Sequence, residues 1–366
     1  MRRRALRAIG GVCAAALLGW AAPAHAQDAG LVAPCLRSEV PAGARDYCVA
    51  VAQALTSAQP QVGMLLAGGN PLLGSASTAG LRLSRSPGAS AVLKANFVEV
   101  RIPDVLDRDA AAAGGALSGE RSVFAPSISG TLALNLTPGV DLAPTVGGIG
   151  SVDLLGSLGW VPLRALGVSA FRLEMDEFAY AIGARVGVLR ESFTLPGASV
   201  SLLYRRFGEV GYGSVCRTPL GTTTTTEEGY RFSAGTCPGE GDPGELSLDL
   251  TNWSARGVLG KQLGRIGVAA GAGFDRFDSD VGLGFRAPAG GVPGVDGFAA
   301  RASDLRVESD RWSFFGNASY TSLVTTFTLE AGWMRGGEAV AGFPAGGDFD
   351  PGRGTLFGSI GVRLAY

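Results

Sequence analysis

The sequence predicts an all-β fold, an antiparallel transmembrane β-barrel of about 12 strands with a short N-terminal helical extension or plug. Three observations predict it: a secretory-type beginning, a last segment that alternates and ends on an aromatic residue, and short alternating segments between turn-rich loops. We expect three parts. They are a signal peptide (1–26), an N-terminal helical extension or hatch (27–60) and the barrel (61–366).

The N-terminal segment has the parts of a secretory signal peptide. A basic start precedes an apolar run from Ala8 to Ala22, and Ala24-His25-Ala26 forms a small-x-small cleavage site. The apolar run is shorter than the ~20 residues that span a bilayer, and Pro23 breaks it. We therefore expect cleavage before Gln27 rather than a retained membrane anchor.

The C-terminal segment predicts a lipid-facing strand. Its apolar residues fall on one face of an extended chain, and small or polar residues fall on the other. The apolar face carries Leu356, Ile360, Val362, Leu364 and Tyr366. An aromatic residue that ends such a strand is typical of a barrel wall. The alternative is the edge strand of a soluble, secreted β protein.

Four of these terminal positions carry a resemblance. Ser359, Gly361, Leu364 and Tyr366 match the pattern polar, any, Gly, any, any, apolar, any, aromatic. In this the sequence resembles bacterial outer-membrane β-barrel proteins, whose last strand carries that pattern as an assembly signal. The resemblance implies the outer membrane of a Gram-negative cell, contact with its lipid, and insertion by the barrel-assembly machinery.

Composition agrees with a membrane barrel and disfavours two other classes. The mean hydropathy is +0.23, yet the longest uncharged stretch, Val49 to Leu81, is broken by Pro60 and Pro71 and cannot be one transmembrane helix. The chain has 31 basic and 32 acidic residues, and removal of residues 1–26 takes four arginines, which leaves 27 − 32 = −5. That mild acidity argues against nucleic acid as a partner.

The single histidine, His25, lies in the predicted signal peptide. The outer-membrane barrel enzymes that this fold resembles use a histidine for acid–base work, so we expect no enzymatic activity, and we expect no cofactor or metal. Four cysteines remain after cleavage, and an even number in an exported chain indicates disulfides. Proximity favours Cys35–Cys48 and Cys216–Cys237, with a zinc site as the alternative.

The segment before the barrel predicts a helix. Tyr47, Val51 and Leu55 recur at a spacing of four between Arg45 and Gln59, and Pro60 is expected to end the helix. Two interpretations stay open: a plug inside the barrel, or a periplasmic extension pinned by its disulfide.

The strands are predicted from the alternation of apolar and polar residues and from the lengths of the segments between them. Bacterial barrels have short periplasmic turns and longer outer loops. The last strand must end in the periplasm, so the glycine-rich segments are expected outside. The outer loops are predicted at 103–121, 212–244, 278–303 and 335–351. The strands are predicted at 61–69, 79–86, 91–102, 126–137, 149–160, 177–190, 198–210, 246–259, 265–277, 304–319, 322–334 and 352–366.

Charged residues opposite the apolar face are predicted to line the lumen. They are Lys94, Asp153, Arg185, Arg205, Asp249, Glu330 and Arg363. Charges of both signs on that face set the field of a narrow pore, or they form internal ion pairs in a packed interior. The first hypothesis is therefore a passive channel or transporter for an unknown small solute, gated by loops or by residues 27–60. The second is a structural or surface-interaction barrel with a closed interior.

One further resemblance concerns the connection to the barrel. A helix followed by Gly69-Asn70-Pro71 and then a barrel resembles outer-membrane transporters for fatty acids and other hydrophobic compounds. Those proteins carry an N-terminal hatch with an Asn-Pro near its end. An ordinary Asn-Pro turn is the alternative.

Overall fold

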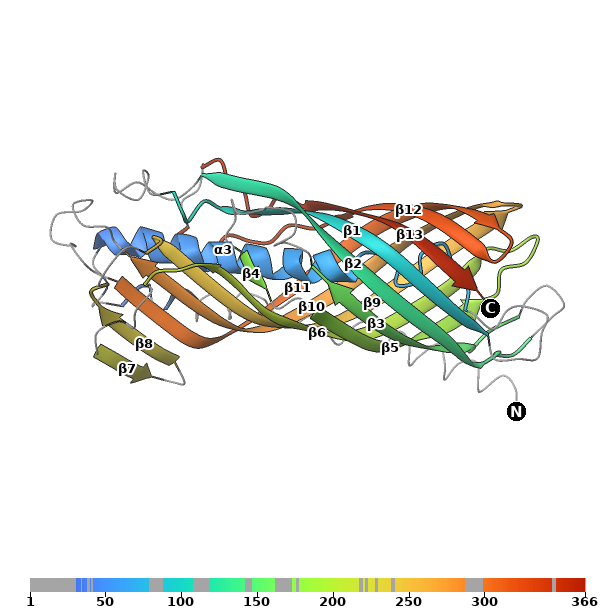
Figure 1. The fold of residues 1–366 in the computed structure, drawn as a ribbon, viewed down its shortest axis with the longest axis horizontal. Coiled ribbons are helices and arrows are strands. Elements are labelled where there is room, and N and C mark those ends of the chain that lie inside the picture. Colours follow the sequence, from blue (N-terminus) through green and yellow to red (C-terminus); the bar gives the residue numbers. More distant parts are fainter. Residues whose placement is uncertain are drawn as a thin grey trace.

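The computed structural model is an elongated barrel with one long helix inside it (Figure 1). The structure describes residues 31–33, 35–37, 40, 42–78, 88–107, 119–141, 147–161, 173–175, 178–216, 220, 223–227, 230–237, 241–286, 299–343 and 347–365. The predicted signal peptide, the predicted strand at 79–86 and Tyr366 lie outside these residues. None of the described helices is long and apolar enough to cross a bilayer.

Within the described part of the chain, ten antiparallel strands close into a ring. The order is β10-β9-β6-β5-β3-β2-β1-β13-β12-β11, and β11 pairs with β10 to close it. The ring strands are β1 (Ala89–Pro103), β2 (Glu120–Thr137), β3 (Val152–Trp160), β5 (Phe178–Leu189), β6 (Gly197–Gly213), β9 (Gly244–Leu263), β10 (Ile266–Arg286), β11 (Ala299–Ser322), β12 (Thr325–Met334) and β13 (Thr355–Ala365). The antiparallel barrel is confirmed, and the predicted total of about 12 strands is wrong.

The error in the strand count comes from the start of the barrel. Residues 61–67, predicted as a strand, are the end of helix α3 (Ala42–Ala67), and the first ring strand starts at Ala89. The helix therefore continues seven residues beyond the predicted boundary at residue 60. Helix α3 contains Pro60, which was expected to end it. A proline inside a helix costs about 3 kcal/mol, and here the barrel wall packs around the helix on both sides of Pro60, so buried contacts offset that cost.

Connection lengths differ between the two ends of the barrel. At the end where β13 finishes, the connections run over 138–151, 190–196, 264–265 and 323–324, and the last two are two-residue turns. At the other end the connections between ring strands run over 104–119, 161–177, 214–243, 287–298 and 335–354. Short turns belong to the periplasmic side and long loops to the outside. This assigns the C-terminal end to the periplasm.

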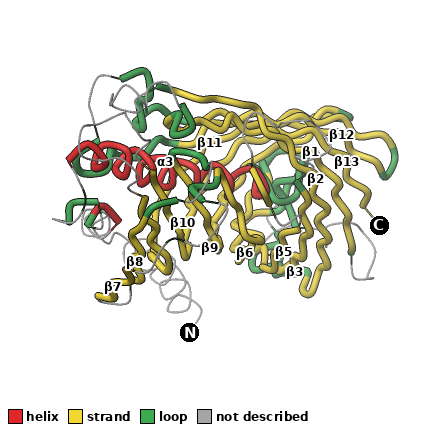
Figure 2. Tube along the Cα trace, turned by 60° about the vertical axis from the view of Figure 1, so that its left-hand side comes forward, coloured by secondary structure: helices red, strands yellow, loops and turns green. Residues whose placement is uncertain are grey.

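Helix α3 lies along the barrel axis, with its beginning at the extracellular end (Figure 1). Gln61 contacts Arg101, close to the extracellular end of β1, whereas Ala67 contacts Lys94, nearer its periplasmic start. Residues 68–78 continue towards the periplasm, where Thr78 meets Ser151 just before β3. Figure 2 shows the helix enclosed by strands. Helix α3 and residues 68–78 thus lie within the ring of strands, and we call them the plug.

The outer wall carries an apolar band that ends in an aromatic belt. Exposed apolar side chains alternate with buried ones along the ring strands. Towards the extracellular side, aromatic residues of neighbouring strands pair with each other: Tyr204 with Trp253, Phe274 with Trp312, and Phe314 with Trp333. Such a belt is typical of the membrane–water interface of a barrel.

Both predicted disulfides form in the structure. Cys35–Cys48 ties the chain before α3 to the beginning of that helix, and Cys216–Cys237 closes the loop after β6. The second bridge brackets a hairpin of β7 (Thr223–Glu227) and β8 (Tyr230–Gly235). Strand β8 pairs with the start of β11, so the hairpin extends the wall at the extracellular end. A short strand, β4 (Leu173–Met175), pairs with the end of β6.

Candidate functional site

The interior of the barrel is the candidate site because most of the predicted lumen residues meet there. Five of them point inward and are buried: Lys94, Asp153, Arg185, Arg205 and Glu330. Arg363 lies on the inward face of β13, and its guanidinium donates to the Thr326 hydroxyl at 3.4 Å. Six side chains from different strands thus lie inside the wall, as alternation predicts.

Asp249 is a correction. Its side chain is 45% exposed and lies 3.5 Å from Arg206 on the outer wall. Its neighbours Leu248 and Leu250 are the buried ones. In the extracellular half, the inward face of β9 is apolar because it packs against α3. The rule that apolar residues face lipid is reversed there, and it put Asp249 on the wrong side.

The extracellular half of the interior is an apolar core shared by helix and wall. Val51, Leu55 and Leu65 of α3 are fully buried and belong to one cluster with Phe277 and Phe285 of β10. The contact is close: the ring of Phe277 occupies the space that a side chain at Gly63 would need, with 2.1 Å from the ideal Cβ position to Cε1. Packing of this kind is that of a protein interior, so the helix is part of the fold.

The periplasmic half holds a buried polar network at the end of α3. The Glu330 carboxylate accepts hydrogen bonds from the backbone N–H groups of Gly69 (3.0 Å) and Asn70 (2.9 Å). The Lys94 ammonium donates to the Ala67 carbonyl at 2.9 Å, and Arg256 donates to the Gly69 carbonyl at 3.2 Å. Cations at the last carbonyls of a helix satisfy orphan acceptors and favour the helix dipole.

Asn70 shapes the turn that follows the helix. Its side-chain oxygen accepts from the Leu72 N–H at 3.1 Å, and its amide donates to the Ser75 carbonyl at 3.1 Å. Arg185 also donates to the Ser75 carbonyl, at 2.9 Å. The Asn70-Pro71 turn is thus a structured connection. It is held by Arg185 of β5, by Glu330 of β12 and by the side chain of Asn70 itself.

An ion pair that the sequence analysis did not single out supports this network. Arg256 and Asp275 are both fully buried, and their side chains are 2.9 Å apart. Arg205 lies nearby and donates to Asn252 at 3.2 Å and to Ser254 at 2.6 Å. Arg256 shares the inward parity of Asn252 and Ser254, and that polar run of alternate residues was the signal that could have found it.

Two residues of the assembly pattern face the interior. The Ser359 hydroxyl donates to Asn96 at 2.9 Å. A side chain at Gly361 would meet the plug, since its ideal Cβ position lies 2.7 Å from Leu73 Cδ1. Leu364 lies on the outward face. The small and polar positions of this terminal pattern therefore serve the interior of this barrel.

The wall is incomplete in its extracellular half. Strand β1 pairs with β13 only up to Val98, and β11 pairs with β12 only from Ser313 onward. Above these points the two long strands β1 and β11 are not bridged by further strands among the described residues. We call this region the lateral gap.

Glutamines of α3 close the lateral gap. The Gln61 amide bonds both backbone groups of Arg101, accepting from its N–H at 2.6 Å and donating to its carbonyl at 2.9 Å. Gln59 donates to the Val307 carbonyl of β11 at 2.9 Å, and Gln53 accepts from the Val340 N–H at 2.7 Å. Side-chain amides thus take the place of a missing strand pairing, as buried backbone groups require.

Only a small space remains at this seam. A cavity of about 20 Å³ lies between α3 and segment 335–354, which is room for about one water molecule. Its lining includes Gln53, Gln61, Arg101, Arg311, Arg335 and Arg353. Among the described residues, no group of histidine, cysteine, aspartate and glutamate side chains has the arrangement of a metal site.

Comparisons with known proteins give distant structural likeness only. No protein-family model matches the chain, and no curated protein matches it. It is similar to the outer-membrane protease OmpT from Escherichia coli, with 11% identity, 78% of this chain and 100% of that chain covered, and a TM-score of 0.32. It is also similar to the translocator domain of the autotransporter NalP from Neisseria meningitidis (11% identity, 78% and 90% covered, TM-score 0.35). A third similar structure is the CymD monoaromatic hydrocarbon channel (11% identity, 84% and 97% covered, TM-score 0.27).

Three features of the molecule define its class. The strands close without an edge in the lower half, the outer wall is apolar, and an aromatic belt marks one interface. The chain therefore has the fold of a transmembrane β-barrel.

Proposed function

We propose that this protein is a closed, non-enzymatic outer-membrane barrel that acts through its extracellular end. The single observation that carries the proposal is the filled lumen. An apolar core occupies the extracellular half and a buried polar network the periplasmic half. A passive pore needs a continuous water-filled path, and three of the side chains that were predicted to line one, Lys94, Arg185 and Glu330, are bonded to residues 67–75 instead.

The extracellular end has features suited to interaction. The beginning of α3, with the bridge Cys35–Cys48, lies there, and so does the hairpin β7–β8 with the bridge Cys216–Cys237. Disulfides stiffen short loops and lower the entropy that a bound partner would have to remove. We propose that these stiffened segments form the functional surface. Insertion by the barrel-assembly machinery is part of the same proposal.

Single-channel recording tests the closed state. The purified full chain, shown to be folded by its heat-modifiable mobility in gel electrophoresis, is added to a planar bilayer beside a known porin as control. The proposal expects a silent bilayer with this protein and discrete steps with the porin. Reproducible steps from the folded full chain would overturn it.

A second candidate function is a transporter for small or hydrophobic solutes, and the lateral gap favours it. The wall between β1 and β11 is held there by three glutamine side chains and segment 335–354 rather than by a ladder of strands. Displacement of that segment would open the wall sideways. Uptake into proteoliposomes that is abolished by a disulfide between segment 335–354 and α3 would favour this candidate over the closed barrel.

A further inference from the structure

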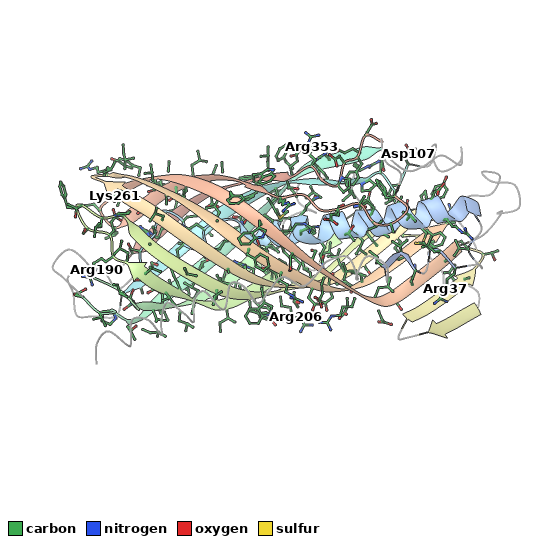
Figure 3. All side chains as sticks on the ribbon, turned by 180° about the vertical axis from the view of Figure 1, so that it is seen from behind. Arg37, Asp107, Arg190, Arg206, Lys261 and Arg353 are labelled. Carbon is green, nitrogen blue, oxygen red and sulfur yellow. A yellow bond between two sulfur atoms is a disulfide. The ribbon has the colours of Figure 1, made fainter. Side chains whose placement is uncertain are left out.

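Two arginines on the outer wall stand apart from the other arginines at the extracellular side. Arg206, Arg276 and Arg306 each have a carboxylate partner: Asp249, Glu308 and Asp278, respectively. Arg335 and Arg353 are exposed, and among the described residues neither has an ion-pair partner. Figure 3 shows Arg353 pointing away from the wall, with Arg206 on the opposite side of the barrel.

The two arginines lie at the base of one hairpin stem. The Gly337 N–H donates to the Pro351 carbonyl at 2.9 Å and joins the two legs of segment 335–354. Arg335 and Arg353 each lie two residues below this bond, one on each leg. The Arg335 N–H donates to the Trp312 carbonyl at 2.8 Å, which fixes the first leg to β11. Both side chains border the same shallow pocket at the lateral gap.

Arg335 and Arg353 lie at the level of the membrane–water interface. Trp333 precedes Arg335 by two residues on the outward face of the wall, a rise of about 7 Å along a strand. Trp333 stacks on Phe314 with 6.4 Å between ring centroids, as part of the aromatic belt. Cations directly above an aromatic belt are at the level of lipid headgroups. Two acids, Glu338 and Asp350, also border the pocket, and Asp350 accepts from the Gly352 N–H at 2.8 Å.

The wall below the arginines is apolar. Leu356, in register with Trp333, is 55% exposed beneath the stem, and Ile360 and Leu329 continue the apolar face towards the periplasm at 57% and 60% exposed. Acyl chains pack along such a wall, and guanidinium groups above it attract phosphate, which arginine binds with two parallel hydrogen bonds.

We propose that Arg335 and Arg353 bind the phosphate of an anionic lipid in the outer leaflet, with its acyl chains along the apolar wall below. The occupant is a lipid because the cationic pair, the aromatic belt and the apolar wall lie on one face, in the order of headgroup and chains. The site is independent of whether the lumen is closed.

Native mass spectrometry of the folded protein in detergent tests the site with lipid A, a diphosphorylated glycolipid, as the probe. The variant Arg335→Gln/Arg353→Gln is expected to bind lipid A at least about tenfold more weakly, the effect of losing charge-assisted hydrogen bonds. The matched control is Arg206→Gln/Arg306→Gln, which removes the same charge from ion-paired positions on the outer wall. It is expected to bind within about twofold of the natural chain, because those guanidinium groups are already engaged.

Further measurements distinguish binding of a lipid phosphate from binding of free phosphate. Lipid A stripped of its phosphates is expected to lose the preference for the natural chain over the glutamine variant, and inorganic phosphate at equal concentration is expected not to displace lipid A. Arg335→Lys/Arg353→Lys keeps both charges and is expected to retain most of the binding, which separates a charge effect from damage to the stem. Unchanged binding in the glutamine variant, an equal loss in the control, or displacement by inorganic phosphate would overturn the proposal.

Discussion

The carboxylate of Glu330 offers the sharpest perturbation of the plug. It accepts the Gly69 and Asn70 N–H groups at 3.0 and 2.9 Å, in a site where Glu330 is only 2% exposed. Glu330→Gln keeps the shape and one acceptor oxygen. Its new NH₂ group faces one of the two backbone donors, and the charge that balances Lys94 is lost.

The expected cost follows from these contacts. A hydrogen bond to a charged group contributes about 1.5–3 kcal/mol, and here one such bond is lost and the other becomes neutral. With the buried Lys94 ammonium left without its counter-charge, we expect a total of about 3–5 kcal/mol of unfolding free energy. The assay is the denaturant midpoint of the folded band in heat-modifiable gel electrophoresis.

A matched control separates this effect from loss of charge alone. Asp249→Asn removes an acid that is 45% exposed on the outer wall, 3.5 Å from Arg206. Exposed pairs contribute about 0–1 kcal/mol, so its midpoint is expected to stay close to that of the natural chain. If Glu330→Gln and Asp249→Asn have the same midpoint, the reasoning about the plug is refuted.

Three further outcomes are expected. Gly361→Ala places a methyl group 2.7 Å from Leu73 Cδ1 and 2.9 Å from the Leu93 carbonyl oxygen, and it is expected to lower the stability of protein refolded without assembly factors by about 1–3 kcal/mol; an unchanged denaturant midpoint would count against the clash. Gln61→Leu leaves both backbone groups of Arg101 unpaired and costs about 2–4 kcal/mol, to be read from the same denaturant midpoint; an unchanged midpoint would show that the seam does not need this glutamine. An impermeant maleimide is expected to label Arg37→Cys on intact cells but not Lys261→Cys, because the beginning of α3 and the turn after β9 lie at opposite ends of the barrel (Figure 3); the reverse labelling would invert the assigned orientation.

The strands near the C-terminus were predictable because their two faces differ clearly. β12 and β13 put apolar side chains on lipid and small or polar ones inside, and the predicted segments 322–334 and 352–366 overlap them closely. There the interior is polar, so the alternation of apolar and polar residues correctly predicts which face of each strand points inward. The same rule found Lys94, Arg185 and Glu330 inside the wall.

Alternation failed where helix and wall share an apolar core. Leu246, Leu248 and Leu250 point inward because α3 packs against them, so the apolar face of β9 changes sides along its length and Asp249 was misplaced. Strands β10 and β11 also extend beyond their predicted ends into the expected outer loops. Sequence periodicity alone does not show that a helix fills the lumen.

Other features depend on contacts between segments far apart in the chain. Pro60 predicted a helix end, but enclosure by the wall lets α3 continue to Ala67. The seam role of Gln59 and Gln61 requires β12 and β13 to be shorter than their neighbours, which only the strand pairing reveals. Both disulfides, in contrast, follow from proximity along the chain.

Hydrogen exchange of helix α3 in the folded barrel tests the central claim most directly. Peptides covering residues 48–66 are followed by mass spectrometry beside peptides from β9 and β10. If the helix is packed inside the wall, its amides exchange as slowly as those of the strands. Complete exchange of the helix within seconds, with the strands still protected, would contradict a barrel closed by its own N-terminal segment.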